Sequence, residues 1–494
     1  MARMTRGTAF AILAALFAAA SAAGSATITV INGNQAGVGF NDPTPATPVG
    51  GNTGTTIGQQ RLIAFQHAAD LWGALLDSSV EIRIRATFEA LDCTTDTAVL
   101  GATAPNQAVS DFPNAPFPGT WYPAALGNRL AGQELSPNAD DVLARFNVNL
   151  GNPGCFDGIG WYYGLDNNHG NKIDLVAVLL HEFAHGLGFL TFVTDQGVEF
   201  QNQPDIFERN IFDDTTNKHW TEMTEAERGT SAVNTGHLLW DGPTVTAMAP
   251  QFLGGTPALT IDSPASVAGN YIVSTAAFGP DVSEDAISGG IVAAIDPADV
   301  AGMSTTDGCT AFSNASLVAG KIALIDRGSC DFVDKSANAE AAGAIAVIIA
   351  DNVPNSLPPL GVRENAPTIH IPTVGISQAD GATIRAALGG SAVSGRIHIN
   401  VRMKAGEGSG GRLKLYAPNP DEPGSSISHW DTSAFPNLLM EPNLTGSLPH
   451  TVDLTLPLLY DIGWRPDTSP APVARSAIQT TTGGGEPKVV TPRP

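Results

Sequence analysis

The sequence predicts an α+β fold in which a separate α/β module interrupts a larger unit. Three observations lead to this prediction. A helical pattern at 56–76 precedes an alternating strand at 80–91, and a second, strongly apolar helix lies at 173–189. From about Gly254 to Val401 the chain becomes rich in Gly, Ala, Val and Ile. With 494 residues the chain is too long for one ordinary core, so at least two domains are expected.

The first residues have the pattern of a secretory signal peptide at 1–22. Arg3 and Arg6 precede an apolar run from Thr8 to Ala20, and the small residues that follow allow cleavage. The run is shorter than the roughly 20 apolar residues of a membrane-spanning helix. We therefore expect export to the extracellular space or a periplasm, with no membrane span after signal removal.

Four cysteines suit an exported chain, in which an even number usually forms disulfides. Three connectivities are possible. The simplest pairs Cys93 with Cys155 and Cys309 with Cys330, because each pair then lies inside one predicted domain. None of the four has the close spacing of a thiolate zinc site, which disfavours a cysteine-bound metal.

Composition and charge exclude two classes of protein. Hydrophobic residues make up 43% of the chain, which is enough to fill its cores and argues against disorder of the whole chain. The formal net charge is −23, and so acidic a surface repels phosphate backbones. Nucleic acid is therefore not an expected partner.

The larger unit begins with a short strand at 26–31 and a Gly/Pro/Asn-rich loop, before the helix and strand at 56–91. The apolar helix that follows can be capped by Asp174 and ended by Gly186 and Gly188. Within the module, a helix at 332–342 lies among strands, in the order of a β-α-β unit. We expect those strands at 321–325, 345–350 and 373–376.

His181-Glu182-Phe183-Ala184-His185 is an H-E-x-x-H sequence on the apolar helix. Positions i and i+4 differ by about 40° around a helix axis, so both imidazoles can bind one metal ion. Glu182 lies beside the first ligand, where it can accept a proton from metal-bound water as a general base. Two histidines and a glutamate can also be an ordinary polar core feature. The apolar run before the motif, the glycines after it and the export signal favour a catalytic Zn²⁺ site.

A catalytic zinc ion normally has three protein ligands and one open position. Metzincins supply the third from H-E-x-x-H-x-x-G-x-x-H, and here Gly188 is present but the last position is Thr191. The third ligand must therefore come from another part of the chain.

The C-terminal part contains Ser428-His429-Trp430, then Asn437-Leu438-Leu439-Met440-Glu441-Pro442, then Leu458-Leu459-Tyr460-Asp461-Ile462-Gly463-Trp464. Together with the H-E-x-x-H block, this order resembles the leishmanolysin-type metzincins. The resemblance implies that His429 is the third ligand and that Met440 is the methionine beneath the zinc ion. It implies a metzincin-like catalytic domain.

Other third ligands remain open from the residues alone. His219 and His237 are nearer in sequence, and His450 lies close to the same C-terminal block. Glu199 or Glu208 would serve in a gluzincin, which has no methionine turn. An Asp/Asn cluster also precedes the zinc helix, where Ca²⁺ is conceivable, although capping and a polar loop are the preferred interpretation. It consists of Asp166, Asn167, Asn168, Asn171 and Asp174.

The module resembles the protease-associated (PA) domain. The matching blocks are the stretch from Gly308 to Asn352, which contains Arg327 and the Cys309–Cys330 pair, and the later IPTVGIS at 371–377. The resemblance implies a non-catalytic lid or docking surface for substrates. Some exopeptidases with a PA domain bind two zinc ions through scattered ligands, and their catalytic domains do not depend on H-E-x-x-H.

The sequence thus predicts a secreted zinc metalloendopeptidase acting on proteins or peptides. The alternative is a catalytically inactive zinc-fold protein that acts in binding or adhesion through its PA domain. The intact Glu182 favours catalysis, because a structural zinc needs no base. The expected boundaries are a signal peptide at 1–22, a catalytic domain at 27–255 and 402–464, a PA domain at 256–401 and a disordered tail at 465–494.

Overall fold

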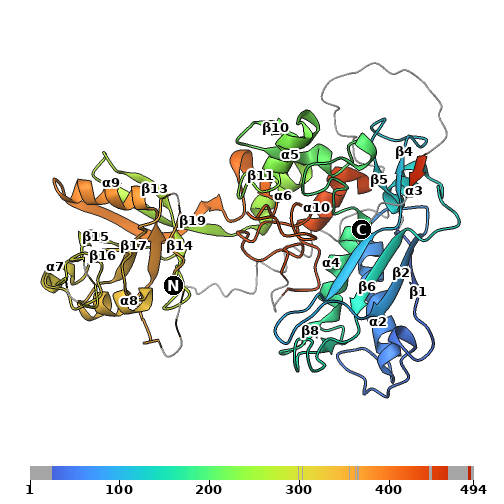
Figure 1. Cartoon of the computed structure of the whole chain (residues 1–494), viewed down its shortest axis with the longest axis horizontal. Helices are drawn as coiled ribbons and strands as arrows, with labels where there is room; N and C mark the ends of the chain where they lie inside the picture. Colours follow the sequence, from blue (N-terminus) through green and yellow to red (C-terminus); the bar gives the residue numbers. More distant parts are fainter. Residues whose placement is uncertain are drawn as a thin grey trace, which may run out of the picture. The chain divides into compact units, whose positions relative to one another are not determined.

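The computed structural model describes residues 25–465 and 488–490, apart from 299, 303, 355, 362, 364–365 and 444–447. The predicted signal peptide lies outside the described residues. The chain divides into two compact units (Figure 1). Unit 1 consists of Met1–Leu253 and Gly406–Pro494, and unit 2 of Gly254–Ala405. These boundaries lie close to the change of composition seen in the sequence.

Unit 1 is built on a four-stranded mixed sheet in the order β1-β2-β6-β3. Its strands are β1 (Ile28–Asn32), β2 (Ile82–Glu89), β6 (Val142–Asn147) and β3 (Gly101–Pro105). The first three run parallel, and β3 pairs antiparallel with β6 at the edge. Side chains of β2 alternate between the core and the surface, as the sequence pattern predicts for a half-buried strand.

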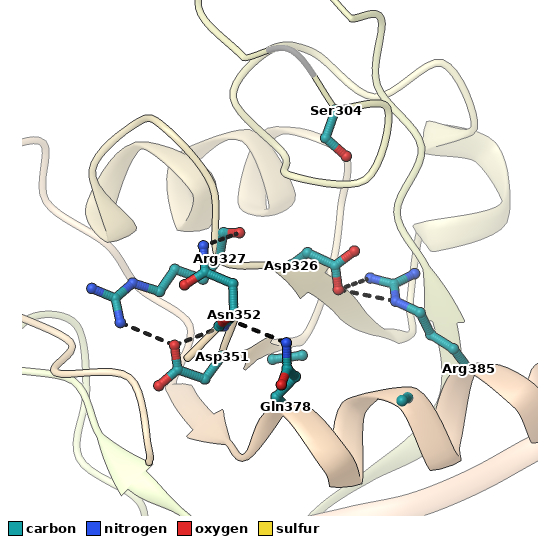
Figure 2. Close-up of a pocket in the computed structure, with 9 residues that line it drawn as sticks. Ser304, Asp326, Arg327, Asp351, Asn352, Gln378 and Arg385 are labelled. Atoms are coloured by element: carbon teal, nitrogen blue, oxygen red, sulfur yellow. Dashed lines mark hydrogen bonds and ion pairs between the residues drawn. The ribbon is translucent and has the colours of Figure 1, made fainter. Parts of the chain in front are cut away.

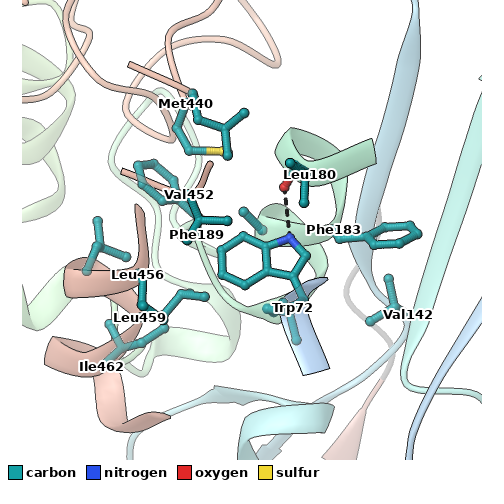
Figure 3. Packing of buried hydrophobic residues seen from close by; sticks show 14 of the residues in the cluster. Trp72, Val142, Leu180, Phe183, Phe189, Met440, Val452, Leu456, Leu459 and Ile462 are labelled. Atoms are coloured by element: carbon teal, nitrogen blue, oxygen red, sulfur yellow. Dashed lines mark hydrogen bonds between the residues drawn. The ribbon is translucent and has the colours of Figure 1, made fainter. Parts of the chain in front are cut away.

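Two long helices contact this sheet, α2 (Ile57–Leu75) against β1 and α4 (Leu175–Leu187) against β3 and β6. Thr56 caps α2 by accepting a hydrogen bond from the backbone N–H of Gln59. The two helices are joined where the indole Nε1 of Trp72 donates to the carbonyl of Leu180 at 3.1 Å. Trp72 is fully buried, so this bond lies in the core of unit 1 (Figure 3).

The rest of unit 1 consists of short elements around this core. A second sheet has the order β10-β9-β11-β20, and two smaller sheets have the orders β21-β4-β5 and β7-β8. Among the described residues of the chain, no helix is long and apolar enough to cross a membrane. The strands are β4 (Ala108–Ser110), β5 (Tyr122–Pro123), β7 (Trp161–Tyr162), β8 (Ile173–Asp174), β9 (Ile211–Asp213), β10 (Lys218–His219), β11 (Leu238–Trp240) and β20 (Leu413–Lys414). The helices are α3 (Ala124–Ala131), α5 (Glu225–Ser231), α6 (Pro243–Phe252) and α10 (Thr455–Leu459), with single turns η1 (Gly39–Asn41), η2 (Phe200–Asn202), η3 (Glu208–Asn210), η4 (Trp220–Glu222), η5 (Ser409–Gly411) and η6 (Tyr460–Trp464).

One part of the C-terminal tail differs from the expectation of disorder. Strand β21 (Lys488–Val490) pairs antiparallel with β4, and Lys488 forms an ion pair with Asp111 at 3.3 Å. A Pro- and Gly-rich composition predicted no strand here, but backbone pairing to an available edge does not require a strand-like composition. The rest of the predicted tail after Arg465 lies outside the described residues.

Unit 2 contains an eight-stranded sheet in the order β13-β12-β19-β15-β16-β17-β18-β14. The central strands β15 to β18 are parallel and the others antiparallel. The observed β16-α8-β17 order agrees with the β-α-β unit predicted from sequence. The strands are β12 (Gly255–Ser263), β13 (Gly269–Ile272), β14 (Ser274–Thr275), β15 (Ile287–Ala293), β16 (Ile322–Asp326), β17 (Ala346–Ala350), β18 (Thr373–Ile376) and β19 (Val393–Lys404), and the helices are α7 (Ala315–Val318), α8 (Phe332–Ala341) and α9 (Gln378–Leu388).

Candidate metal centre

Helix α4 carries the H-E-x-x-H sequence, and its sequence explains where it begins and ends. The side chain of Asp174 accepts hydrogen bonds from the N–H groups of Val176 and Ala177 at 2.9 and 3.3 Å. The helix stops at Gly188, whose φ of 122° excludes most other residues. A Cβ atom there would also lie 2.7 Å from the Cδ1 atom of Ile462. The apolar run makes α4 a fully buried helix, so the motif lies in the core of unit 1.

The structure brings His181, His185 and His429 together. Their potential ligand atoms all lie within 4.8 Å of one another, and all three side chains are buried. The Nε2 atom of His181 lies 3.2 Å from the Nε2 atoms of both His185 and His429. Residues 181 and 429 are 248 positions apart, so unit 2 is inserted between ligand candidates of one cluster.

Each of the three imidazoles is oriented by a backbone carbonyl. The Nδ1 atoms of His181, His185 and His429 lie 2.7, 2.8 and 2.7 Å from carbonyl oxygens. These oxygens belong to Leu439, Phe189 and Ser425, respectively. A carbonyl oxygen only accepts, so each Nδ1 carries the proton and each Nε2 of a neutral ring carries a lone pair. The lone pairs of three rings therefore point into one small space.

Burial keeps these rings neutral. It lowers the pKa of His181 to about 4 and that of His185 to about 3, and it lowers the pKa of His429 well below 6.5. With no proton between them, Nε2 atoms 3.2 Å apart repel each other unless a cation lies among them. Three neutral imidazoles, each oriented by a carbonyl oxygen at its Nδ1 atom, form the donor set that Zn²⁺ takes at catalytic sites. The residues present therefore fit a zinc ion.

Glu182 lies beside this cluster in an apolar setting. Its side chain is 7% exposed, and its Oε2 atom has no hydrogen-bond partner. Burial raises the pKa of Glu182 to about 7, while the nearby Thr103 hydroxyl acts in the opposite direction without forming a well-aligned hydrogen bond. A Cβ atom on Gly101 would lie 3.0 Å from Oε1 of Glu182. The edge strand β3 thus passes directly beside the carboxylate.

Met440 lies in the core next to the cluster. It is fully buried and packs among apolar residues that include Phe189 and Val452 (Figure 3). The preceding residue, Leu439, provides the carbonyl that orients His181, and the Met440 carbonyl accepts from the N–H of Trp430, the residue after His429, at 2.7 Å. The turn around Met440 therefore contacts both sides of the histidine cluster.

The alternative third ligands have other partners and lie outside the cluster. Three histidines pair with aspartates, and two glutamates face one arginine. The pairs are His219–Asp241 at 2.8 Å, His237–Asp214 at 2.7 Å, His450–Asp174 at 3.0 Å, Glu199–Arg228 at 3.1 Å and Glu208–Arg228 at 3.7 Å.

The Asp/Asn loop before α4 is explained by capping and turn bonds. Asp166 accepts from the Tyr162 hydroxyl at 2.6 Å and from the N–H of Asn168 at 3.2 Å, and Asp174 caps the helix. Within the part of the chain that the structure describes, the three-histidine cluster is the one group with metal-binding spacing. The loop gives no support to a Ca²⁺ site.

Both disulfides have the simplest of the connectivities considered from sequence. Cys93 is bonded to Cys155 in unit 1, and Cys309 to Cys330 in unit 2. Each bridge closes a loop within a single unit.

Unit 2 contains a cavity of about 350 Å³ at the carboxyl ends of β16 and β17 (Figure 2). Two arginine–aspartate pairs line it, Arg327 with Asp351 at 2.9 Å and Arg385 with Asp326 at 2.6 Å. Its lining contains no histidine, cysteine or glutamate. The candidate metal ligands and Glu182 belong to unit 1.

Sequence reasoning missed several groups of the site. Gly101 and Thr103 approach Glu182, and the Leu439 carbonyl orients His181. No local spacing signals these contacts, because each joins segments far apart in the chain.

Comparison with known proteins identifies the module in unit 2. Residues 287–384 match the family model of the PA domain. Leucine aminopeptidase 2 of Arthroderma otae is 41% identical over 97 residues, which cover 19% of this chain and 18% of that protein. The minor extracellular protease Vpr of Bacillus subtilis is 33% identical over 88 residues, covering 18% and 10%. An aminopeptidase of Pseudomonas aeruginosa is 48% identical over 65 residues, covering 13% and 12%.

Among solved structures, the zinc aminopeptidase BSAP of Bacillus subtilis covers 30% of this chain and 31% of its own, with a TM-score of 0.23 and 22% identity. This chain aligns with less than a fifth of the length of each of the three curated relatives, leucine aminopeptidase 2, Vpr and the Pseudomonas aminopeptidase. The family match at 287–384 identifies the PA domain within unit 2, and the histidine cluster is interpreted from its own geometry.

Proposed function

We propose that the protein is an exported zinc-dependent endopeptidase with a metzincin-like catalytic domain, like the leishmanolysin-type enzymes it resembles. The proposed zinc ligands are His181, His185 and His429, with Glu182 as general base and Met440 beneath the centre. The observation that carries the proposal is the convergence of three neutral Nε2 lone pairs beside a buried carboxylate oxygen without a partner.

The chemistry of the residues suits hydrolysis of a peptide bond. When bound, zinc supplies Lewis acidity that favours ionisation of a water molecule near pH 7. Glu182 accepts the proton of the attacking water at its carboxylate and passes it to the leaving amine. Burial raises its pKa to about 7 in the absence of metal, which favours uptake of the proton that the water releases.

The edge strand supports cleavage within a chain. In the sheet order β1-β2-β6-β3, β3 is an edge strand that pairs with β6 alone among the residues that the structure describes, so its outer edge can pair with an extended peptide. Gly101 on this strand lies beside Glu182. A substrate held by its backbone can continue in both directions past the scissile bond, so neither terminus has to be recognised.

The PA domain supports a role in peptide hydrolysis without fixing its type. The curated relatives that share a stretch of this length are named as peptidases. We assign the PA domain a non-catalytic role in substrate docking, since the carboxylates of its cavity are paired with arginines. The predicted N-terminal signal and the two disulfides support export.

The test compares the chain without residues 1–22 with its Glu182→Gln variant, at equal and measured zinc content. The substrates are unfolded casein and a quenched fluorescent peptide blocked by N-acetylation and C-amidation, and the same peptide with free ends serves as the comparison. We expect the unmodified chain to cleave both and Glu182→Gln to cleave neither, because the amide cannot take up the proton.

Three outcomes would change the proposal. Cleavage of an unblocked peptide but not of the blocked one indicates an aminopeptidase. Equal cleavage by Glu182→Gln rules out the assigned base. Silence of both proteins at full zinc content on all substrates favours the inactive zinc-fold binding protein.

A further inference from the structure

Thr191 stands where metzincins with the compact motif place their third histidine. Its side chain is not part of the histidine cluster, and its hydroxyl donates to Oδ2 of Asp205 at 2.7 Å. Its hydroxyl oxygen also accepts from the N–H of Val193 at 3.1 Å. Thr191 is therefore fixed by hydrogen bonds on both sides.

Asp205 is the anchor of this arrangement. It is 2% exposed, and its carboxylate accepts from the N–H of Phe192 at 2.6 Å and from that of Glu208 at 2.7 Å. With the Thr191 hydroxyl, three donors converge on one buried carboxylate, which is how a buried charge becomes tolerable. The segment that leaves α4 is therefore held rigidly at residues 191–193.

This segment contacts the part of the chain that carries the proposed third ligand. The N–H of Thr191 donates to Oγ of Ser428 at 3.3 Å, across 237 positions of sequence. Beside this bond, the rings of Phe189 and Trp430 meet edge to face with centroids 5.0 Å apart. Both contacts flank His429, whose ring is oriented by the Ser425 carbonyl.

We propose that Thr191 and Asp205 are positioning residues that hold Ser428, and through it His429, against the end of helix α4. This inference rests on the proposed function, since it takes His429 as a zinc ligand. Thr191 occupies the position at which the compact motif places a ligand, and here it holds the segment that carries His429.

The size of the effect follows from the role. Loss of a group that orients a metal ligand typically weakens metal binding 10–100-fold. Thr191→Val keeps the shape and the backbone bond to Ser428 but removes the hydroxyl donor from Asp205. We expect zinc binding to weaken about tenfold in Thr191→Val, and to return to within about threefold of the unmodified chain in Thr191→Ser, which restores the hydroxyl.

The matched control is Thr215→Val. The Thr215 hydroxyl also donates to a buried carboxylate, that of Asp213, at 2.6 Å, and it accepts from the Asn234 amide at 3.0 Å, so these two partners lie outside the segments around the histidines. Zinc affinity is measured on the full exported chain by competition with a chelator. The visible absorption of Co²⁺-loaded protein reports ligand geometry as a second readout. We expect a weakened and shifted Co²⁺ spectrum in Thr191→Val and an unchanged one in Thr215→Val.

Two results separate failure of this inference from failure of the proposed site. If the unmodified chain does not bind zinc, or if His429→Ala binds zinc as tightly as the unmodified chain, the proposed zinc site is wrong. The positioning role of Thr191 and Asp205 is then wrong as well. If His429→Ala loses zinc but Thr191→Val binds within twofold of the unmodified chain, or no more weakly than Thr215→Val, the positioning role alone is wrong. Should Thr191→Val fail to fold, Ser428→Ala, which removes the acceptor, gives the same test.

Discussion

Asp461 belongs to the C-terminal block that resembles leishmanolysin-type metzincins, and the structure gives its carboxylate a capping role at long range. Helix α6 begins after Gly242, which has no side chain to accept from the first N–H groups. Asp461 accepts instead, from the N–H of Thr244 at 2.8 Å and that of Val245 at 3.1 Å. The same carboxylate accepts from the Trp240 indole at 3.2 Å. Its side chain is fully buried.

Asp461→Ala removes the shared acceptor of these donors and the ion pair with the Arg465 guanidinium, 3.3 Å away, which keeps its hydrogen bonds to the Tyr460 carbonyl and the Thr244 hydroxyl. Each hydrogen bond to a charged acceptor contributes about 1.5–3 kcal/mol, and breaking a buried ion pair from one side costs about 3–5 kcal/mol. Because these contributions overlap, we expect unit 1 to lose about 4 kcal/mol of unfolding free energy.

Tryptophan fluorescence measures this loss in unit 1 alone, because all seven tryptophans lie there. The assay is urea unfolding of the zinc-free chain. The control is Glu89→Ala, which removes an exposed ion pair with Arg145 and should cost less than about 1 kcal/mol. If Asp461→Ala costs no more than Glu89→Ala, the capping role is refuted.

The same unfolding assay tests three further predictions. Replacing Cys93 and Cys155 together by Ala should cost unit 1 about 4 kcal/mol, given their separation of 62 residues, and a cost below about 1 kcal/mol would contradict this. Met440→Ala should cost about 2–5 kcal/mol and Met440→Leu less than about 1.5 kcal/mol, and equal costs would argue against close packing. Burial raises the pKa of Asp141 from 3.8 in the unfolded chain to about 7 in the folded one, so the folded state binds more protons between these two pH values. The contribution of protonated Asp141 to the unfolding free energy is therefore complete below pH 3.8 and is lost as the pH rises through 7. From pH 5 to 8 the unmodified chain should therefore lose about 2–3 kcal/mol more than Asp141→Asn, and equal losses would refute the shift.

The features that sequence predicted well are local. Helix α4 is defined by its own apolar run, by Asp174 at its start and by Gly188 at its end. The spacing of His181 and His185 then follows from helix geometry. All of this lies within one stretch of chain, so no knowledge of packing was needed.

The third proposed ligand, His429, could be predicted only from the resemblance of its sequence block to leishmanolysin-type metzincins. Several histidines and glutamates were compatible with the residues alone, and three-dimensional packing decides among them. His219 and His237 are closer in sequence, but each faces an aspartate elsewhere in unit 1. Periodicity carries no information on which distant segment returns to the end of a helix.

Other features could not be predicted at all. The antiparallel strands β12, β13 and β19 widen the sheet of unit 2 beyond the β-α-β pattern, and their sequences are interrupted by polar residues and glycine. The anchoring of Thr191 by Asp205, and the capping of α6 by Asp461, join residues whose pairing has no sequence signature.

Unit 2 is inserted between residues proposed to bind one zinc ion, so the chain must leave unit 1 and return to it at neighbouring points. In unit 2, Gly255 pairs with Lys404, and the N–H of Ala405 donates to the carbonyl of Gly254 at 3.1 Å. The chain thus enters and leaves unit 2 through neighbouring residues of one antiparallel pair. A short linker can therefore span the gap, and closing so short a loop costs little entropy.

We expect a chain in which 255–404 is replaced by Gly-Gly to fold and to bind zinc within about threefold of the full chain, since the ligands and the groups that orient them all belong to unit 1. Cleavage of the short blocked peptide should persist, while cleavage of protein substrates should fall if the PA domain docks them. Tryptophan fluorescence measures the unfolding of the shortened chain, and competition with a chelator measures its zinc affinity. Loss of cooperative unfolding or of zinc binding would show that unit 2 holds His429 in place, which the contacts within unit 1 do not require.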